Sequence, residues 1–269
     1  MASKLEMKKS RISLADTYRS LLARISSDQI FYAQIAITVI FGLLILYLLT
    51  RRVVRSVGGR GRSIVLVGNC EAGKTALLYT LTRGQTPITV TSFKDNEDLY
   101  NTGNSLGENS MKSVRVVDVP GHERVRSNAF DKHKSDARAI VFLLDSTSLG
   151  SQIKDVAEQL FTVLSDSVVQ GNRCPVAVLC NKQDQDLAKS ATIIERALQK
   201  EFDVLRETSS SRLASISNDG NQRPSKPLGV TGKPFAFSQV TYNPVTFMET
   251  SVVEDKSLAN LKRWIEAVA

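Results

Sequence analysis

Residues 68–75 read GNCEAGKT: a glycine, four free positions and then Gly-Lys-Thr, the spacing of a phosphate-binding loop. The apolar run SIVLV before it (63–67) predicts a buried strand, and KTALLYTLTR after it (74–83) predicts a helix. In such a loop backbone N–H groups converge on phosphates, Lys74 reaches the β- and γ-phosphates, and the Thr75 hydroxyl ligates Mg²⁺. A glycine-rich turn that merely precedes a helix would not explain both side chains. The residues predicted to bind phosphate are Gly68, Asn69, Cys70, Glu71, Ala72, Gly73, Lys74 and Thr75.

The chain beyond this loop alternates short apolar runs with helical patterns. The apolar runs, each read as a strand, are 113–119, 137–145, 175–180 and 244–249. One helix carries Ile153, Val156, Leu160 and Leu164 on one face, and the last helix carries Leu258, Leu261, Trp264, Ile265 and Val268 at helical spacing. Strand–helix alternation indicates an α/β fold with a mostly parallel central sheet covered on both faces. We therefore predict one α/β domain over residues 63–269.

Two further motifs follow predicted strands and indicate which nucleotide is bound. In DVPG (118–121), the Asp118 carboxylate can hold Mg²⁺ through water, and the Gly121 N–H can sense a γ-phosphate. In NKQD (181–184), Asn181 and Lys182 can contact the nucleotide, and the Asp184 carboxylate can accept hydrogen bonds from the N1–H and 2-amino groups of guanine. Adenine offers neither donor, so this tetrapeptide favours GTP over ATP and disfavours a membrane-tethered ATPase.

The positive charge of the chain lies outside the predicted domain. Of the net charge of +8, residues 1–29 contribute +3 (six basic, three acidic) and residues 51–62 contribute +5 (five arginines, no acid), which leaves residues 63–269 formally neutral. Nucleic-acid binding needs basic residues on the folded surface. We therefore expect no direct binding of nucleic acid.

A run of twenty residues without a charge, 30–49, separates the two basic segments. At about 1.5 Å per residue a helix of this length spans roughly 30 Å, the thickness of a bilayer's hydrocarbon core. A buried helix would alternate polar positions, and a cleaved signal peptide would have a shorter apolar core and small exit residues, whereas this run ends in TRRVVRS. Because the more basic flank stays cytosolic, we predict a lumenal segment (1–29), a transmembrane helix (30–49), a basic linker (50–62) and a cytosolic domain.

Three other features of the domain are expected to be structural. Cys70, Cys174 and Cys180 form no CxxC pair, so they are read as reduced, buried thiols. His133 is read as a solvated helix residue. Residues 207–233, rich in Ser, Asn, Gly and Pro, predict a mobile surface loop, either a spacer or a regulatory or docking segment.

The three motifs, in this order, resemble the first, third and fourth signature elements of the Ras-like small GTPases, and the resemblance covers residues 63–269. It implies that ETS (249–251) is the fifth element, where Ser251 and the Val252 N–H border the guanine. Val252 departs from the alanine that is usual there. It also implies that one threonine of TPITVTS (86–92) joins Mg²⁺ in the GTP state. The candidates are Thr91, which we favour, Thr89 as its alternate, and Thr86.

Two residues depart from the common pattern, and the first of them, Cys70, resembles the Arf-related branch. Cys70 stands where many Ras relatives have glycine, so an arginine supplied by a partner would be crowded. His122 stands where these relatives carry the glutamine that orients the attacking water. It either positions water as a neutral imidazole or contacts a partner while hydrolysis stays slow or partner-dependent.

The chain lacks the usual lipidation signals, since it opens with Met-Ala and ends in IEAVA. With DVPGHE, KSDARAIVFLLDS, DVAEQL and CNKQD, it is similar to the β subunits of the signal recognition particle receptor, a membrane-anchored family of Arf-like GTPases. The resemblance implies an endoplasmic reticulum protein that binds GTP or GDP with Mg²⁺. It also implies that the protein holds the receptor's α subunit at the membrane, close to docked ribosomes and the translocon. The alternative is a cycling Arf-like GTPase of membrane traffic that recruits coats or tethers.

Overall fold

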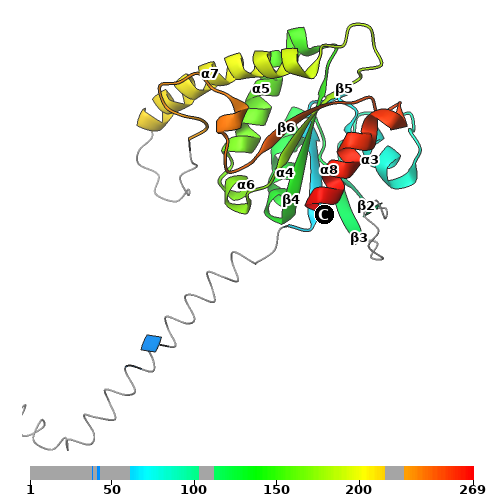
Figure 1. The fold of residues 1–269 in the computed structure, drawn as a ribbon, viewed down its shortest axis with the longest axis horizontal. Coiled ribbons are helices and arrows are strands. Elements are labelled where there is room, and N and C mark those ends of the chain that lie inside the picture. The colour runs from blue at the N-terminus through cyan, green and yellow to red at the C-terminus, as the bar shows by residue number, and fades with distance from the viewer. Residues whose placement is uncertain (1–37, 39–40, 43–60, 103–111, 216–226) are drawn as a thin grey trace, which may run out of the picture. The chain divides into compact units, whose positions relative to one another are not determined.

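The computed structural model (Figure 1) describes residues 61–102, 112–215 and 227–269, together with Thr38, Phe41 and Gly42. The chain divides into two compact units, residues 1–59 and 60–269, and the fold is that of the second. Its strands are β1 (Ser63–Gly68), β2 (Asn96–Thr102), β3 (Lys112–Asp118), β4 (Ala137–Asp145), β5 (Val176–Asn181) and β6 (Val245–Glu249). Its helices are α3 (Lys74–Arg83), α4 (Glu123–His133), α5 (Leu149–Ser165), α6 (Ser167–Asn172), α7 (Ala191–Ser215) and α8 (Ala259–Val268), with short 3₁₀ turns η1 (Lys134–Asp136), η2 (Phe237–Gln239) and η3 (Asp255–Leu258).

The strands form one six-stranded sheet in the order β2-β3-β1-β4-β5-β6. Every pairing is parallel except that of β2 with β3. In Figure 1, α5 and α7 lie on one face of the sheet and α3 and α8 on the other. The predicted α/β fold with a mostly parallel, doubly covered sheet is therefore confirmed.

The central strands divide the hydrophobic core into two layers. Along β1, Val65 and Val67 pack among the residues of α4 to α7, whereas Ile64 and Leu66 pack beneath α3 and α8. Successive side chains of a strand point to opposite faces, so a strand covered on both sides must be apolar at every position. This is why the central strands appear in the sequence as unbroken apolar runs.

Strand β2, which reads NEDLYNT, shows no strand pattern in the sequence and was not predicted. It lies at the edge of the sheet, and Tyr100 and Thr102 are its buried residues. Its pairing with β3 runs from Asn96 opposite Asp118 to Thr102 opposite Lys112. Its own composition is too polar to predict a buried strand. Its pairing with β3 therefore specifies it.

The predicted loop at 207–233 is wrong at its first described end, whereas residues 227–233 form neither helix nor strand and are mostly exposed. Helix α7 continues to Ser215, and hydroxyls within it bond back to earlier carbonyls: Thr208 Oγ1 to Val204 O at 2.8 Å and Ser209 Oγ to Arg206 O at 3.0 Å. Such bonds let Ser and Thr remain in a helix. At the other end Leu228 is buried in the core. Residues 216–226 lie outside the described residues.

The predicted membrane helix at 30–49 lies outside the described residues except for Thr38, Phe41 and Gly42. In the described part of the chain, no helix combines the length and apolar character needed to cross a bilayer. Cys174 and Cys180 are buried as predicted, and burial raises the pKa of their thiols to about 11 and about 12. The prediction is wrong for Cys70, which is exposed because it lies on the phosphate loop.

Candidate functional site

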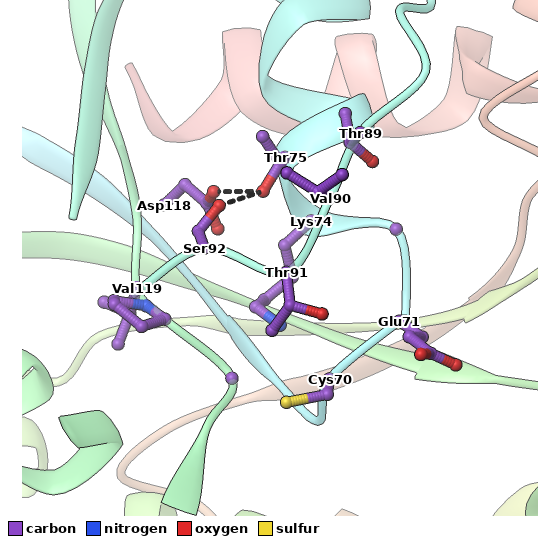
Figure 2. Close-up of a pocket in the computed structure, with 13 residues that line it drawn as sticks. Cys70, Glu71, Lys74, Thr75, Thr89, Val90, Thr91, Ser92, Asp118 and Val119 are labelled. Atoms are coloured by element: carbon purple, nitrogen blue, oxygen red, sulfur yellow. Dashed lines mark hydrogen bonds between the residues drawn. The ribbon is translucent and has the colours of Figure 1, made fainter. Parts of the chain in front are cut away.

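The carboxyl ends of the strands bring the predicted motifs to one edge of the sheet. β1 ends at Gly68, β3 at Asp118, β5 at Asn181 and β6 at Glu249. Ligands of open α/β sheets bind at this edge, and a cavity of about 390 Å³ opens there (Figure 2). It is lined by Cys70, Glu71, Gly73, Lys74, Thr75, Thr89, Val90, Thr91, Ser92, Asp118, Val119, Pro120 and Gly121.

Two glycines let the loop turn tightly between β1 and α3. Gly68 has a φ of +147° and Gly73 a φ of +96°, which side chains rarely adopt. A Cβ at position 68 would lie 2.1 Å from the Leu143 carbonyl oxygen, and one at position 73 would lie 2.5 Å from Asn181 Nδ2. A larger residue at either position would therefore push the loop away from β4 and β5.

Lys74 is buried, with 6% of its surface exposed. Its Nζ donates a hydrogen bond to the Asn69 carbonyl oxygen at 2.6 Å, and burial lowers its pKa while the nearby Asp118 opposes that shift. Within the described residues no carboxylate lies within 4 Å of this ammonium. A buried cation without a counter-ion is costly unless it binds an anion, so the side chain fits a phosphate ligand.

Asp118 and Thr75 form the candidate magnesium site. Thr75 Oγ1 donates to Asp118 Oδ2 at 2.6 Å, and Asn96 Nδ2 reaches the same oxygen at 3.3 Å. Asp118 is 1% exposed, and its Oδ1 has no hydrogen-bond partner in the described structure. Burial raises the pKa of Asp118, against the opposing effects of Thr75 and Lys74. An Mg²⁺ ion held through water would give the unpartnered oxygen a donor and the carboxylate a counter-charge, so these residues fit the ion.

The three candidate threonines between α3 and β2 lie in two different environments. Thr89 and Thr91 line the cavity, whereas Thr86 Oγ1 faces Thr80 Oγ1 and the Val252 carbonyl, away from Asp118. Ser92, which was not among the predicted site residues, has its Oγ 3.2 Å from Thr75 Oγ1. Ser92 ends the TPITVTS segment, of which only the threonines were candidates, and Asn96 begins the polar strand β2. Only their proximity to Thr75 and Asp118 in the structure indicates that they belong to the site.

The NKQD and ETS motifs meet beside the loop. Asn181 is buried, its Nδ2 donates to the Ala72 carbonyl at 2.8 Å, and its Oδ1 accepts from the Val252 N–H at 3.2 Å. Ser251 Oγ donates to Asp184 Oδ1 at 2.7 Å. Asp184 itself is exposed, as a carboxylate that meets a base must be.

Lys182 follows Asn181 with a φ of +65°. Its Nζ pairs with Asp145 Oδ2 at 2.6 Å. The pair fixes the lysine stem along the strand ends of β4 and β5, beside the predicted guanine site.

His122 is the N-cap residue of α4, and its Nδ1 accepts a hydrogen bond from the Arg124 N–H at 3.4 Å. Its ring lies 5.4 Å from the ring of Phe93, which is 65% exposed. The imidazole therefore stands between the end of the DVPG motif and the exposed segment after α3. Both roles predicted for it, water positioning and partner contact, remain predictions.

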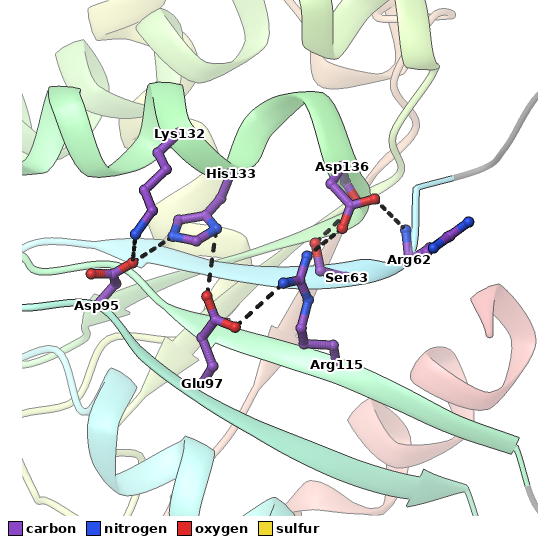
Figure 3. Close-up of polar contacts among 8 residues, drawn as sticks. All are labelled: Arg62, Ser63, Asp95, Glu97, Arg115, Lys132, His133 and Asp136. Carbon is purple, nitrogen blue, oxygen red and sulfur yellow. Dashed lines mark hydrogen bonds and ion pairs between the residues drawn. The ribbon is translucent and has the colours of Figure 1, made fainter.

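The prediction that His133 is solvated is wrong. The residue is 5% exposed, with Nε2 at 2.7 Å from Asp95 Oδ2 and Nδ1 at 3.9 Å from Glu97 Oε1 (Figure 3). Lys132 also pairs with Asp95 at 2.6 Å, and Arg115 pairs with Glu97 at 3.3 Å. A hydrogen bond from Lys132, and to a smaller extent one from His133, lowers the pKa of Asp95. Although these two acids and the histidine are close enough to hold a metal ion, each carboxylate already has a cationic partner, so the group ties α4 to β2.

The sheet has this strand order, the phosphate loop lies between β1 and α3, and the Asp118 and Asn181 motifs lie at the same edge. This arrangement is the fold of the small GTPases.

Comparison with known proteins narrows this class. The family model described as signal recognition particle receptor beta subunit matches residues 59–245. The human signal recognition particle receptor subunit beta is 37% identical over 224 residues, which covers 81% of this chain and 80% of the human protein. The chain belongs to the signal recognition particle receptor beta subunit family of Arf-like GTPases.

Solved structures agree in fold. A chain from the structure of the mammalian SRP receptor superposes with a TM-score of 0.66 and 38% identity, covering 77% of this chain and 100% of that chain. The SRb-GTP/SRX complex from Chaetomium thermophilum superposes with a TM-score of 0.60 at 21% identity, covering 76% and 98%. The second likeness bears on the fold alone.

Proposed function

We propose that this chain binds GTP with Mg²⁺ and, in the GTP-bound state, holds the receptor's α subunit at the endoplasmic reticulum membrane for co-translational protein targeting. The family to which the chain belongs supports the partner. The buried Lys74, the unpartnered Asp118 oxygen and the Asn181 and Asp184 motif support the ligand.

The segment between α3 and β2 carries the proposal, because it faces both the cavity and the solvent. Thr89, Val90 and Thr91 line the cavity. Ile88 is fully exposed, and Val90 and Phe93 are 85% and 65% exposed. If Thr91 or Thr89 closes on a γ-phosphate and its Mg²⁺, the exposed apolar side chains of this segment must move with it. A partner that contacts them would then have different affinities for the two nucleotide states.

Relatives have been solved with the ligands that the proposal assigns. The Chaetomium protein is described as SRb-GTP in complex with SRX, as SRb-GDP and as SRb-GDP-Mg. For the present chain we infer the same pair of nucleotides and the same ion, held by Lys74, Thr75 and Asp118. The bound Mg²⁺ would offset phosphate charge, and Asp184 would select guanine.

The membrane anchor in this proposal is the apolar run 30–49. Its more basic flank, 51–62, leads into the domain, and this supports a cytosolic domain and a lumenal segment at residues 1–29. A permanent anchor leaves partner binding as the step that GTP controls. Hydrolysis is then slow or partner-dependent, and His122 is its candidate water-positioning residue.

The test measures binding of purified α subunit to the full-length chain in detergent, loaded with a non-hydrolysable GTP analogue or with GDP. We expect the GTP form to bind more tightly. Val90→Asp should abolish this preference, whereas the matched Val204→Asp on α7, where the native valine is 57% exposed, should preserve it. Equal binding in both nucleotide states would contradict the gated-anchor proposal.

His122→Ala separates the proposal from the cycling GTPase of membrane traffic. A small change in GTP hydrolysis fits a slow assembly module, and a large loss fits a cycling enzyme. Capture of coats or tethers by the GTP form, in place of the α subunit, would favour the cycling enzyme as well.

A further inference from the structure

Arg126 of α4 reaches back to the phosphate loop. The helix begins directly after His122, and the Arg126 N–H donates to the His122 carbonyl at 3.0 Å, so the arginine lies in its first turn. Its Nη1 donates to Asn69 Oδ1 at 3.4 Å. A guanidinium from the helix that follows DVPG therefore lies beside the loop that binds phosphate.

Two cations meet at Asn69, and neither has a counter-ion among the described residues. Lys74 donates to the backbone oxygen of Asn69, and Arg126 donates to its side-chain oxygen. The arginine is partly buried and forms no ion pair in the described chain, whereas Arg115 and Arg206 each pair with a carboxylate. Burial lowers the pKa of Lys74, the charge of Asp118 opposes this shift, and the charge of Arg126 adds a smaller lowering. Two neighbouring positive charges, neither with a carboxylate within 4 Å among the described residues, favour an anionic ligand beside them.

The position of Gly121 indicates which phosphate lies within reach. A Cβ at this residue would be 2.7 Å from both the Cys70 nitrogen and Lys74 Nζ, so the stretch that leads into α4 lies directly on the loop. Arg126 approaches the loop from that side, the side predicted to sense the γ-phosphate. A neutral amide oxygen at 3.4 Å is a weak partner, and a phosphate oxygen that accepts two guanidinium N–H groups is a stronger one.

We propose that Arg126 binds the terminal phosphate of GTP, and that Asn69 holds its guanidinium when no nucleotide is present. The inference rests on the proposed binding of GTP. It adds to that function a cation supplied by the chain itself, on the helix whose first turn follows Gly121.

The experiment compares the affinities of the full-length chain for a non-hydrolysable GTP analogue and for GDP, by titration calorimetry in detergent. Arg126→Ala should lower the GTP affinity about tenfold or more and leave the GDP affinity within about twofold, because only GTP carries the third phosphate. Arg126→Lys keeps the charge and should retain part of the preference. Arg124→Ala is the matched control, since it removes the same charge from an exposed side chain of the same turn.

The outcomes separate this inference from the proposed function. If the parent chain binds both nucleotides and Arg126→Ala leaves their affinity ratio unchanged, Arg126 does not contact the terminal phosphate and GTP binding still stands. Equal losses for GTP and GDP would mean a structural latch between α4 and the loop, which also overturns the inference. If Arg126→Ala fails to fold, Arg126→Lys decides: a ratio equal to that of the parent chain counts against the inference, and a reduced ratio supports it. A parent chain that binds neither nucleotide would remove the proposed function and this inference with it.

Discussion

Replacing Asn181 with alanine should lower the free energy of unfolding of the nucleotide-free protein by about 2–6 kcal/mol. Asn181 is 2% exposed and joins the phosphate loop to the fifth motif through Ala72 O at 2.8 Å and Val252 N at 3.2 Å. Alanine leaves this carbonyl and this N–H buried and unpaired, and each such group costs about 1–3 kcal/mol. The sum is a large fraction of the roughly 5–15 kcal/mol by which domains are stable.

The assay is urea unfolding followed by circular dichroism, with the loss read from the midpoint at an unchanged slope. Asn172→Ala is the matched control: the native residue is exposed, and its Nδ2 makes two longer contacts, of 3.3 and 3.5 Å. This control should stay within about 0.5 kcal/mol of the parent protein. Equal losses in the two variants, or none in Asn181→Ala, would refute the view that one buried amide holds the loops together.

Three further predictions concern recognition, the metal ion and pH. Asp184→Asn should lower the affinity for GTP at least about a hundredfold, because two charge-assisted hydrogen bonds to guanine are lost. The same variant should bind xanthosine triphosphate better than the parent protein does, because the 2-oxo group of xanthine accepts a hydrogen bond where the 2-amino group of guanine donates one. Competition against a fluorescent nucleotide measures both affinities. Asp118→Asn should remove most of the Mg²⁺ dependence of GTP affinity, seen as a smaller response to EDTA than in the parent protein. Lys132 and His133 hold the pKa of Asp95 below its usual value, so the stability that this carboxylate contributes is complete above about pH 4 and is lost as the pH falls toward its folded pKa. In thermal melts below about pH 4, the difference in stability between the parent protein and Asp95→Asn should therefore become smaller. A constant difference would contradict the assignment.

The sequence identified those parts of the fold and site whose signal is local. The central strands are apolar at every position because both of their faces are covered, and the loop and DVPG motifs follow these strands directly. Lys74, Thr75 and Asp118, which come from these motifs, accordingly line one cavity.

The features that could not be predicted from the sequence depend on partners that are distant in the chain. β2 is polar and is specified by its pairing with β3. His133 is buried because Asp95 and Glu97, nearly forty residues earlier, surround its ring. Ser92 and Asn96 become candidate site residues only when the sheet brings them to Thr75 and Asp118.

The Asn181 contacts also have a consequence for synthesis of the protein. They join positions 109 and 71 residues apart, and Val252 is the last of the three segments to be translated. Until that residue has left the ribosome, the loop lacks one of its supports and the predicted guanine site lacks one wall. At about 5–20 residues per second the delay between Ala72 and Val252 is on the order of ten seconds or more. A nascent or truncated chain that lacks Val252 would therefore lack one of the two contacts by which Asn181 supports the phosphate loop in the complete domain.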